Sequence, residues 1–377
     1  MKALTRIGAA TLAVAGILTG AVGAAPALAA GANHAVFVQN DRLEGGNQVI
    51  AYSRSNEGTL TQVGVYNTGG NGAKLEGSVV DHTASQGALT YDRADNLLFA
   101  VNAGSNTVSV FAVFGDRLAL RQTISSGGKF PVSVTANRGS VYVLNAEEGG
   151  SIQGYGVSGG RLVAIPSSYR ALGLPVVTPG KDEQFTHTPG QVAFSPDGSK
   201  LIVTTKAAGQ SIDIFTISPV TGLSAEPVVN PEPGTVPFAV TFDRQGHLLV
   251  AEAGTSSLAS FQLNENGTVS QLDAVATEQK AACWVVSAAG KYYTSNAGSA
   301  TLTGFQTSVG GQLLTNLGNT ETHPGTVDAA SVGRFLYVQG GKEGTVDEFE
   351  VEKDGSLKSL GALFVPSGEG GEGIVAS

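Results

Sequence analysis

Three side chains in the sequence have types suited to activating water at an electrophilic carbon: His187, Glu252 and Lys206. His187 is the best candidate base, because an imidazole titrates near neutral pH and this one directly precedes an expected strand. Glu252 is a second candidate base or an orienting partner for His187, and Lys206 could stabilise a developing oxyanion. Each has a structural alternative: a hydrogen-bonded loop histidine, a carboxylate that binds backbone amides, and a lysine paired with Glu252 at a solvated rim.

Acidic residues raise the question of a cation site. Glu147 and Glu148 are adjacent and could bind a cation with Asp41 or Glu44, because carboxylates are suitable calcium ligands. The chain lacks the dense Asp and Asn spacing of a calcium loop, so we predict no metal and no cofactor. The remaining histidines share no metal-ligand spacing and are interpreted as structural or surface residues: His34, His82, His247 and His323.

Cys283 and Trp284 stand side by side at the start of an expected strand. Cys283 is the single cysteine, which excludes an intrachain disulfide, and we interpret it as a small buried apolar residue. Trp284, the single tryptophan, either packs along a channel and between sheets or stacks on a flat ligand. The sequence leaves both interpretations of Trp284 open.

All of these residues belong to copies of one repeating unit, which is complete from Gly190 to Ile217. Apolar and polar residues alternate on either side of the turn Ser195-Pro196-Asp197-Gly198, a pattern typical of short antiparallel strands. Seven segments fit the second strand of such a unit, and most end in Asn, Gln or Glu: 35–40, 97–102, 140–145, 200–205, 247–252, 291–296 and 334–339. These repeats predict an all-β fold, a seven-bladed β-propeller.

The two ends of the chain predict how the ring closes. The segment 373–377 fits a first strand with no partner after it, whereas 35–40 already fits a second strand. We therefore expect these two segments to pair in one blade, which leaves no unpaired central edge. Two insertions interrupt the repeat, Asn67–Gln86 and Pro166–His187, and both are expected on the rim that carries the loops between second and third strands.

Residues 1–30 are predicted to be a secretory signal peptide, and residues 31–377 the propeller. Lys2 and Arg6 precede an apolar run, and Ala27-Leu28-Ala29 fits a small-x-small cleavage site. No later stretch approaches the roughly 20 apolar residues of a membrane-spanning helix, so we expect a secreted, soluble monomer. The net charge of -9 without a basic cluster argues against nucleic acid or an anionic membrane as partner.

Two blocks of sequence resemble a known family: FSPDGSKLIV at 194–203 and VNAGSNTVSVF at 101–111. Together with the small-residue loops they are similar to the seven-bladed β-propeller lactonases, a family that includes 6-phosphogluconolactonases and 3-carboxy-cis,cis-muconate cyclases. The resemblance implies that a small lactone is opened at one mouth of the central channel. It further implies that His187 or Glu252 activates water and that Lys206 gives electrostatic support.

Departures from the family pattern affect the expected substrate. His187 alone remains where the family has paired basic residues, and residues 234–238 lack the basic pair of a Gly-Pro-Arg-His segment. Few cations remain in the rim loops to bind a phosphate: Arg42, Lys129, Lys206 and Lys342. We therefore expect a small lactone or a carbohydrate-like ligand instead of a sugar phosphate. The residues expected to bind it are Arg42, Lys129, Asn145, Trp284, Asn296 and Gln339.

Two functions remain open on the sequence alone. Hydrolysis of a small lactone is the leading hypothesis, because the resemblance covers essentially all of residues 31–377. The alternative is a secreted propeller without catalysis that binds a protein, a glycan or a cell-wall component. It fits the predicted export and the missing basic residues, and a propeller fold by itself does not decide between the two.

Overall fold

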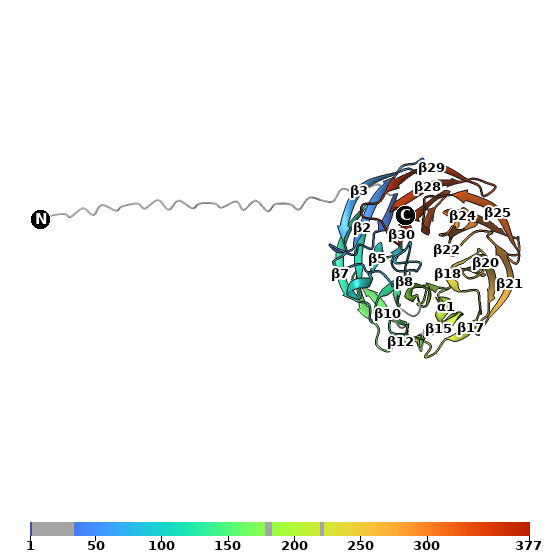
Figure 1. Ribbon diagram of the computed structural model, residues 1–377. Helices are drawn as coiled ribbons and strands as arrows, with labels where there is room; N and C mark the ends of the chain where they lie inside the picture. Colours follow the sequence, from blue (N-terminus) through green and yellow to red (C-terminus); the bar gives the residue numbers. More distant parts are fainter. Residues whose placement is uncertain (2–33, 178–182, 219–221) are drawn as a thin grey trace.

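The computed structural model describes Met1 and residues 34–177, 183–218 and 222–377. These residues form seven antiparallel sheets that stand around a common axis as blades (Figure 1). The predicted signal peptide lies outside the described residues apart from Met1. Within the described ranges, no helix has the length and apolar character needed to span a bilayer.

Each blade runs from a first strand near the axis to a fourth strand at the periphery (Figure 1). Blade 1 contains β30 (Ile374–Ala376), β1 (Ala35–Gln39), β2 (Gln48–Arg54) and β3 (Leu60–Asn67), and blade 2 contains β4 (Leu89–Asp92), β5 (Leu97–Asn102), β6 (Thr107–Phe114) and β7 (Arg117–Ser125). Blade 3 contains β8 (Pro131–Asn137), β9 (Ser140–Asn145), β10 (Ser151–Ser158), β11 (Arg161–Ala164) and β12 (Arg170–Ala171). Blade 4 contains β13 (Gln191–Phe194), β14 (Lys200–Thr204), β15 (Ser211–Ser218), β16 (Gly222–Leu223) and β17 (Val228–Pro231).

The remaining blades have four strands each. Blade 5 contains β18 (Pro237–Phe242), β19 (Leu248–Glu252), β20 (Ser257–Leu263) and β21 (Val269–Ala276), and blade 6 contains β22 (Ala282–Ala288), β23 (Lys291–Asn296), β24 (Thr301–Thr307) and β25 (Leu314–Glu321). Blade 7 contains β26 (Thr326–Val332), β27 (Phe335–Gly340), β28 (Thr345–Val351) and β29 (Leu357–Phe364). Short helical turns lie in rim loops: η1 (Ala103–Ser105), η2 (Gln184–Thr186) and α1 (Lys206–Gly209).

The fourth strands of blades 3 and 4 differ from the prediction, because each is split into two pieces. Both β11 and β12 pair with β10, and both β16 and β17 pair with β15. In blade 3 the second piece, β12, lies within the expected insertion Pro166–His187. The insertion is therefore partly an extension of the blade.

The turn between β13 and β14 shows how the sequence forms a blade. Gly198 has a φ of 78°, in the left-handed region that glycine adopts without strain. The Asp197 carboxylate accepts hydrogen bonds from the hydroxyls of Ser195 and Ser199, at 2.6 and 2.7 Å, and from the Ser199 amide. These hydrogen bonds lower the pKa of Asp197 to about 2. The turn is thus held by local polar contacts on the rim opposite the insertions.

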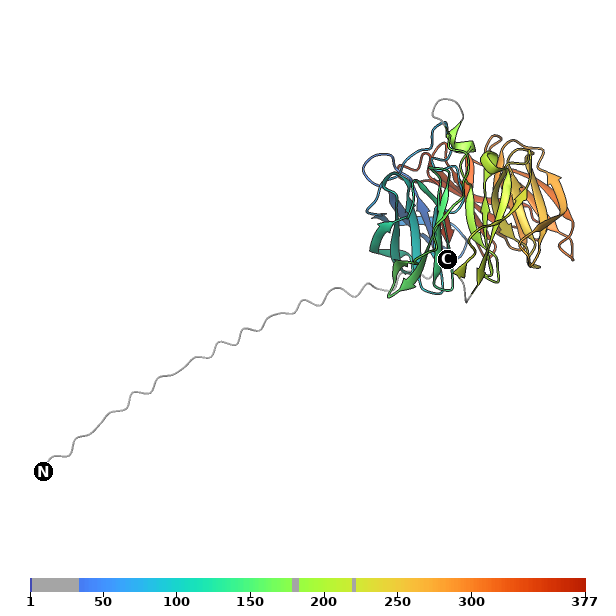
Figure 2. The same cartoon turned by 90° about the horizontal axis from the view of Figure 1, so that it is seen from below.

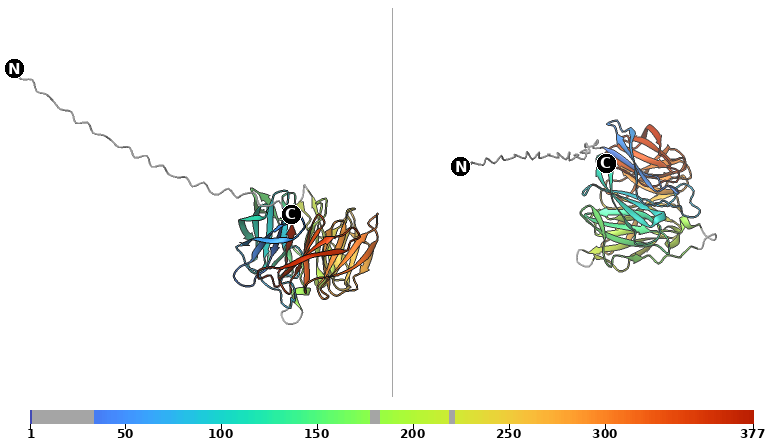
Figure 3. Two further views of the ribbon diagram at one scale, coloured as in Figure 1. Left: turned by 90° about the horizontal axis from the view of Figure 1, so that it is seen from above. Right: turned by 90° about the vertical axis from the view of Figure 1, so that its left-hand side faces the viewer.

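Ring closure follows the prediction. β30 pairs antiparallel with β1, with Val38 opposite Ile374 and Val36 opposite Ala376. Figure 3 shows the blue strands of blade 1 beside the red strands of blade 7, with the C-terminus next to them. Figure 2 shows the same blades side by side in an edge-on view. Apolar side chains from the strands pack between neighbouring blades, for example Phe99 of β5 with Val134 of β8.

Candidate functional site

The central channel is crossed at one mouth by residues 68–87, which we call the plug loop. The side chain of Gln86 forms two hydrogen bonds with the backbone of Val285 in blade 6. The hydroxyl of Ser85 donates a 2.7 Å hydrogen bond to the carbonyl of Val132 in blade 3. Blades 3 and 6 lie on opposite sides of the ring, so the plug loop spans the axis.

A cavity of about 580 Å³, the rim pocket, lies between the plug loop and the loops of blades 6 and 7. Apolar and aromatic side chains form most of its wall: Val79, Val80, Phe185, Phe238, Trp284 and Pro324. Asp81 and Lys342 are the ionised side chains among the described lining residues. A concave apolar site of this size with a few polar groups is typical of a small-molecule site.

Trp284 packs between segments, as one of the two sequence interpretations expected, and its stacking on a ligand stays a prediction. Its ring packs against Phe238 with centroids 4.9 Å apart, and its Nε1 donates a hydrogen bond to the carbonyl of Ser85 in the plug loop. It also lines the rim pocket, although only 3% of its surface is exposed. Trp284 therefore anchors the plug loop and forms part of the apolar wall of the pocket.

Lys206 is buried, not at a solvated rim as one alternative assumed. Its ammonium donates to the carbonyl of Ala84 at 2.7 Å, to the carbonyl of Phe185 at 2.5 Å and to the Thr188 hydroxyl at 3.1 Å. These contacts join the plug loop to the second insertion. Burial lowers the pKa of Lys206 to about 7, although the nearby Asp81 favours the charged ammonium. All three ammonium donors already have partners, so an oxyanion would have to displace one of them.

Asp81 is the ionisable residue that sequence reasoning missed. Its Oδ1 accepts hydrogen bonds from the amide and the hydroxyl of Thr83, at 2.8 and 2.9 Å, and its Oδ2 accepts one from the Ser85 amide at 2.9 Å. Burial raises the pKa of Asp81 to about 6, and these hydrogen bonds oppose the shift. The Asp-x-Thr-x-Ser spacing within an insertion was the available signal, but it does not reveal the burial.

Three further carboxyl groups surround the plug loop: Asp41, Asp328 and Glu372. Glu372 accepts hydrogen bonds from the amides of Gly87 and Ala88, and its own amide donates to Asp41. Burial raises the pKa of Asp41 to about 7 and that of Asp328 to about 6. The pKa of Glu372 is raised well above its usual range by burial and by the neighbouring carboxyls. These groups therefore bind protons at higher pH than exposed carboxyls do.

The structure separates the acids that could have shared a cation. Asp41 is bonded to Gln39 and lies by the channel, whereas Glu147 accepts a hydrogen bond from Gln184 beside blade 3. Among the described residues, no group of three His, Cys, Asp or Glu side chains has the arrangement needed to hold a metal ion. A cation site built from Glu147, Glu148 and Asp41 is therefore not formed.

His187 lies in a different hollow from Asp81. It lines a cavity of about 200 Å³ together with Glu147 and Glu148. Its Nδ1 lies 2.8 Å from the Thr186 hydroxyl and 3.1 Å from the carbonyl of Glu183. The partners of this nitrogen come from its own loop, which is the arrangement of a hydrogen-bonded loop histidine.

Glu252 is also apart from the rim pocket. It is 4% exposed and accepts hydrogen bonds from the hydroxyls of Ser257 at 2.6 Å and Thr255 at 3.2 Å. Burial raises its pKa, and these two hydroxyls oppose the shift. In the described part of the chain, no hydrogen bond or ion pair connects any two of His187, Lys206 and Glu252. The three predicted catalytic residues are therefore not linked to one another by direct polar contacts among the described residues.

The predicted binding residues divide into buried amides and rim cations. The amides are 0 to 3% exposed and hold neighbouring loops and strands through their Nδ2 or Nε2 atoms: Asn145, Asn296 and Gln339. Their burial places them beneath the rim surface. Arg42 lines a wide cavity of about 610 Å³ with His82, and Lys129 is exposed. None of these five predicted binding residues is a lining residue of the rim pocket, whereas Lys342, one of the rim cations considered for phosphate, is.

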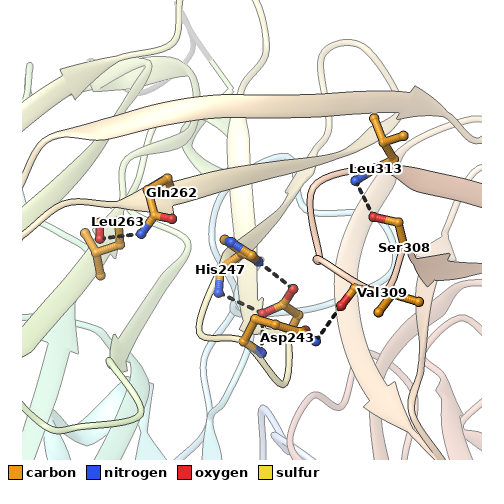
Figure 4. Close-up of polar contacts among 8 residues, drawn as sticks. Asp243, His247, Gln262, Leu263, Ser308, Val309 and Leu313 are labelled. Atoms are coloured by element: carbon orange, nitrogen blue, oxygen red, sulfur yellow. Dashed lines mark hydrogen bonds and ion pairs between the residues drawn. The ribbon is translucent and has the colours of Figure 1, made fainter.

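Two other histidines have carboxylate partners. His247 lies on the opposite rim, where its Nδ1 is 2.8 Å from Asp243 Oδ2 and its amide donates to Asp243 Oδ1 (Figure 4). In the same view Gln262 bonds the carbonyl of Leu263, and the 308–313 turn lies beside the pair. His323 forms a 2.6 Å contact with Asp347 near the top of blade 7. Both histidines hold loops in place, as the sequence interpretation expected.

Fold and pocket together define a seven-bladed propeller with a small-molecule cavity at one channel mouth. A family model described as "Lactonase, 7-bladed beta-propeller" matches residues 20–159 and 175–370. The chain belongs to this lactonase family, as the sequence blocks suggested. No curated protein matches the chain.

Solved structures share the architecture. A candidate 6-phosphogluconolactonase from Bacteroides fragilis has a TM-score of 0.73 and 18% identity, covering 91% of this chain and 98% of the other. The periplasmic gluconolactonase of Pseudomonas aeruginosa has a TM-score of 0.71 and 17% identity, covering 91% and 98%. At such identities the likeness concerns the fold, and the substrate has to be argued from the pocket.

Proposed function

We propose that the protein binds a small, largely apolar lactone in the rim pocket and hydrolyses it. The observation that carries the proposal is the pocket itself, a cavity of about 580 Å³ lined by Phe185, Phe238 and Trp284, with Asp81 among its lining residues. Membership of the lactonase family supports ring opening as the reaction class. A carboxyl group and an apolar wall are the minimum for binding an ester and activating water beside it.

The charge of the pocket favours an apolar substrate over a sugar phosphate. Recognition of phosphate uses several cationic donors, usually including a bidentate arginine. The described lining contains Lys342 and no arginine, and the Asp81 carboxylate would repel a phosphate group. An alkyl- or aryl-substituted lactone needs no cationic donors and is not repelled by the Asp81 carboxylate.

The test is turnover of a lactone panel that pairs apolar lactones with sugar and phosphosugar lactones of similar ring size. We expect ring opening of the apolar members, measured by base uptake at constant pH. An Ala297→Phe variant fills the pocket and should raise KM at least tenfold. Ala94→Phe is the matched control, because Ala94 lines a cavity between strand turns on the opposite rim.

Binding without catalysis is the second candidate function. It is favoured by the lack of a direct hydrogen bond or ion pair, among the described residues, between any two of His187, Lys206 and Glu252. Saturable quenching of Trp284 fluorescence by apolar lactones, with no base uptake over hours, would support this alternative. Absence of both binding and turnover would exclude a lactone as the ligand of the rim pocket.

Export of the mature chain is a separate proposal, supported by the charged and apolar pattern of residues 1–30. Expression of the full chain in a bacterial host should release a protein whose N-terminus begins near Ala30 or Gly31. Mass spectrometry of the extracellular fraction checks this. An uncleaved chain retained with the cells would contradict it.

A further inference from the structure

We propose that Asp81 is the general base of the rim pocket and that Lys206 is its positioning residue. This inference rests on the proposed hydrolysis and adds the residues that perform it. It transfers the catalytic role from His187 and Glu252 to a residue of the plug loop. Asp81 lines the same cavity as the aromatic side chains that would hold the lactone, whereas His187 lines another one.

The plug loop fixes the carboxyl before any substrate arrives. Both oxygens of Asp81 accept hydrogen bonds from Thr83 and Ser85, two and four residues later in the same loop. The loop is anchored in turn by the Trp284 indole, which donates to the Ser85 carbonyl. A base held in this way needs no reorganisation when a water molecule and an ester carbonyl meet beside it.

Lys206 holds the surroundings of that base. Its ammonium bonds the carbonyls of Ala84 and Phe185, and it lies 5.3 Å from the centre of the Phe238 ring. Ala84, Phe185 and Phe238 all line the rim pocket. One buried lysine therefore connects three parts of the pocket wall, and its positive charge favours the ionised form of the neighbouring Asp81.

Other titratable groups also act on Asp81. Asp41, Asp328 and Glu372 each interact electrostatically with it, and so do Cys283 and Lys206. Cys283 is partly exposed and not fully buried as the sequence interpretation expected. Desolvation of its thiol nevertheless raises the pKa to about 12, so the thiol is neutral and does not compete as a base. With the pKa of Asp81 near 6, its carboxylate is ionised and basic enough to act in neutral solution.

The reaction balances with water as the only co-reactant. The Asp81 carboxylate takes a proton from water while the water oxygen forms a bond to the lactone carbonyl carbon. The tetrahedral intermediate then breaks its bond to the ring oxygen, and the Asp81 carboxyl returns the proton to that oxygen. One lactone and one water give one hydroxy acid, and Asp81 is again a carboxylate.

The first experiment compares Asp81→Asn with the control Asp213→Asn on an apolar lactone. Asp213 is also a buried aspartate bonded to a serine hydroxyl, but it belongs to β15 and is not a lining residue of the rim pocket. We expect kcat to fall about 100-fold or more in Asp81→Asn and to stay within a few-fold in the control. Unchanged Trp284 fluorescence and unchanged lactone quenching would show that the variant retains its fold and its pocket.

The second experiment is the pH dependence of kcat/KM in the wild type and in Lys206→Met. The acid limb of the wild type should lie near pH 6, and loss of the ammonium should move it to higher pH, because a positive charge favours the carboxylate. A purely structural role of Lys206 would lower activity without moving the limb. Lys200→Met is the control, since Lys200 is a buried lysine at the other end of β14 bonded to Thr216.

The outcomes separate the two proposals. Turnover by the wild type with full activity in Asp81→Asn overturns the role of Asp81 and leaves the proposed function standing. Loss of turnover in His187→Ala instead would assign the base to the other cavity. No turnover of any lactone by the wild type overturns the proposed hydrolysis and the role of Asp81 with it. An unmoved acid limb in Lys206→Met overturns the role of Lys206 alone.

Discussion

Asp81 in the plug loop and Asp197 in the turn of blade 4 form the same local structure, but their pKa values are shifted in opposite directions. Each carboxylate accepts hydrogen bonds from both the amide and the hydroxyl of the residue two positions later, Thr83 or Ser199. The pKa of Asp197 is lowered to about 2, because the hydrogen bonds favour the charge and the group is exposed. The pKa of Asp81 is raised to about 6, because burial outweighs the same hydrogen bonds.

The comparison teaches that the motif sets the orientation of the carboxyl and that the surroundings set its proton affinity. Asp197 faces solvent at a strand turn, where an ionised carboxylate is the stable form. Asp81 is 2% exposed beside a pocket wall that includes Phe185 and Phe238. Only the second environment produces a base that titrates close to physiological pH.

The most direct test of this difference is to titrate the side-chain carboxyls of Asp81 and Asp197 by carbon NMR. Asp81 should change its chemical shift near pH 6, and Asp197 should show no protonation down to about pH 3. The expected separation is therefore several pH units between two turns with the same hydrogen bonds. The variants Asp81→Asn and Asp197→Asn assign the signals. Coinciding titrations would show that burial does not control the two carboxyls.

The acids around the plug loop predict a fall in global stability as pH rises from about 4 to 7. Their folded-state pKa values are raised above the unfolded ones, so the folded state binds more protons in this window and loses stability as they leave. For Asp41, a shift from 3.8 to about 7 corresponds to an upper limit of about 4 kcal/mol. Chemical denaturation at pH 5 and pH 7 measures the difference.

Asp41→Asn is the variant that tests this prediction. It should flatten part of the pH dependence, because one of the proton-binding groups is removed. Asp197→Asn is the control and should leave the slope between pH 5 and pH 7 unchanged, since Asp197 stays ionised throughout. Lys206 acts in the opposite sense above pH 7, where its lowered pKa makes stability rise with pH. A wild-type stability that increases from pH 5 to pH 7 would contradict the prediction.

Replacing a glycine by alanine should destabilise the protein by different amounts on the two rims. A Cβ at Gly370 would lie 2.1 Å from Nε2 of His82 in the plug loop, and Gly370 has a φ of 73°. Gly246, on the opposite rim, has a φ of 90° but no atom within 4 Å of such a Cβ. We expect Gly246→Ala to cost about 1 kcal/mol from backbone strain alone. Gly370→Ala should cost about 2 kcal/mol or more, because the plug loop must also move.

The measurement is the free energy of unfolding of both glycine variants, together with the fluorescence of Trp284. A displaced plug loop should change the emission of Trp284, because its indole donates to the Ser85 carbonyl. Gly246→Ala should leave the emission as in the wild type. Equal costs for the two substitutions, with no change in emission, would show that His82 does not hold the plug loop against the C-terminal segment.

The blades could be predicted because their signals are local. The predicted segments 97–102, 140–145 and 291–296 coincide with β5, β9 and β23, since alternation and turn residues fix both ends of each strand. Closure of the ring was also predictable, because each end of the chain had an unpaired strand and the two strands could pair with each other. The family followed from two of these strand and turn blocks.

The site could not be predicted in the same way, because its environment comes from distant segments. Trp284 contacts a plug-loop residue 199 positions away, and Glu372 contacts Gly87 across 285 positions. Sequence reasoning selected His187 for its residue type and Lys206 for its charge. Neither property shows that His187 lies in a separate cavity or that Lys206 is buried. The insertion Asn67–Gln86 was predicted to lie on one rim, but Asp81 within it looked like any turn aspartate.

The smallest expected effect concerns the hydroxyl that each motif contributes. Thr83→Val removes the hydroxyl donor from a buried carboxylate, and Ser199→Ala removes it from an exposed one. A buried hydrogen bond to a charged group contributes about 1.5–3 kcal/mol, whereas an exposed one contributes about 0.5–1 kcal/mol. Thr83→Val should therefore destabilise the protein by about 1 kcal/mol more at pH 8, and should also move the acid limb of kcat/KM upwards. Equal destabilisation by both variants, with an unchanged acid limb of kcat/KM, would mean that burial does not strengthen the hydrogen bond from Thr83 to Asp81.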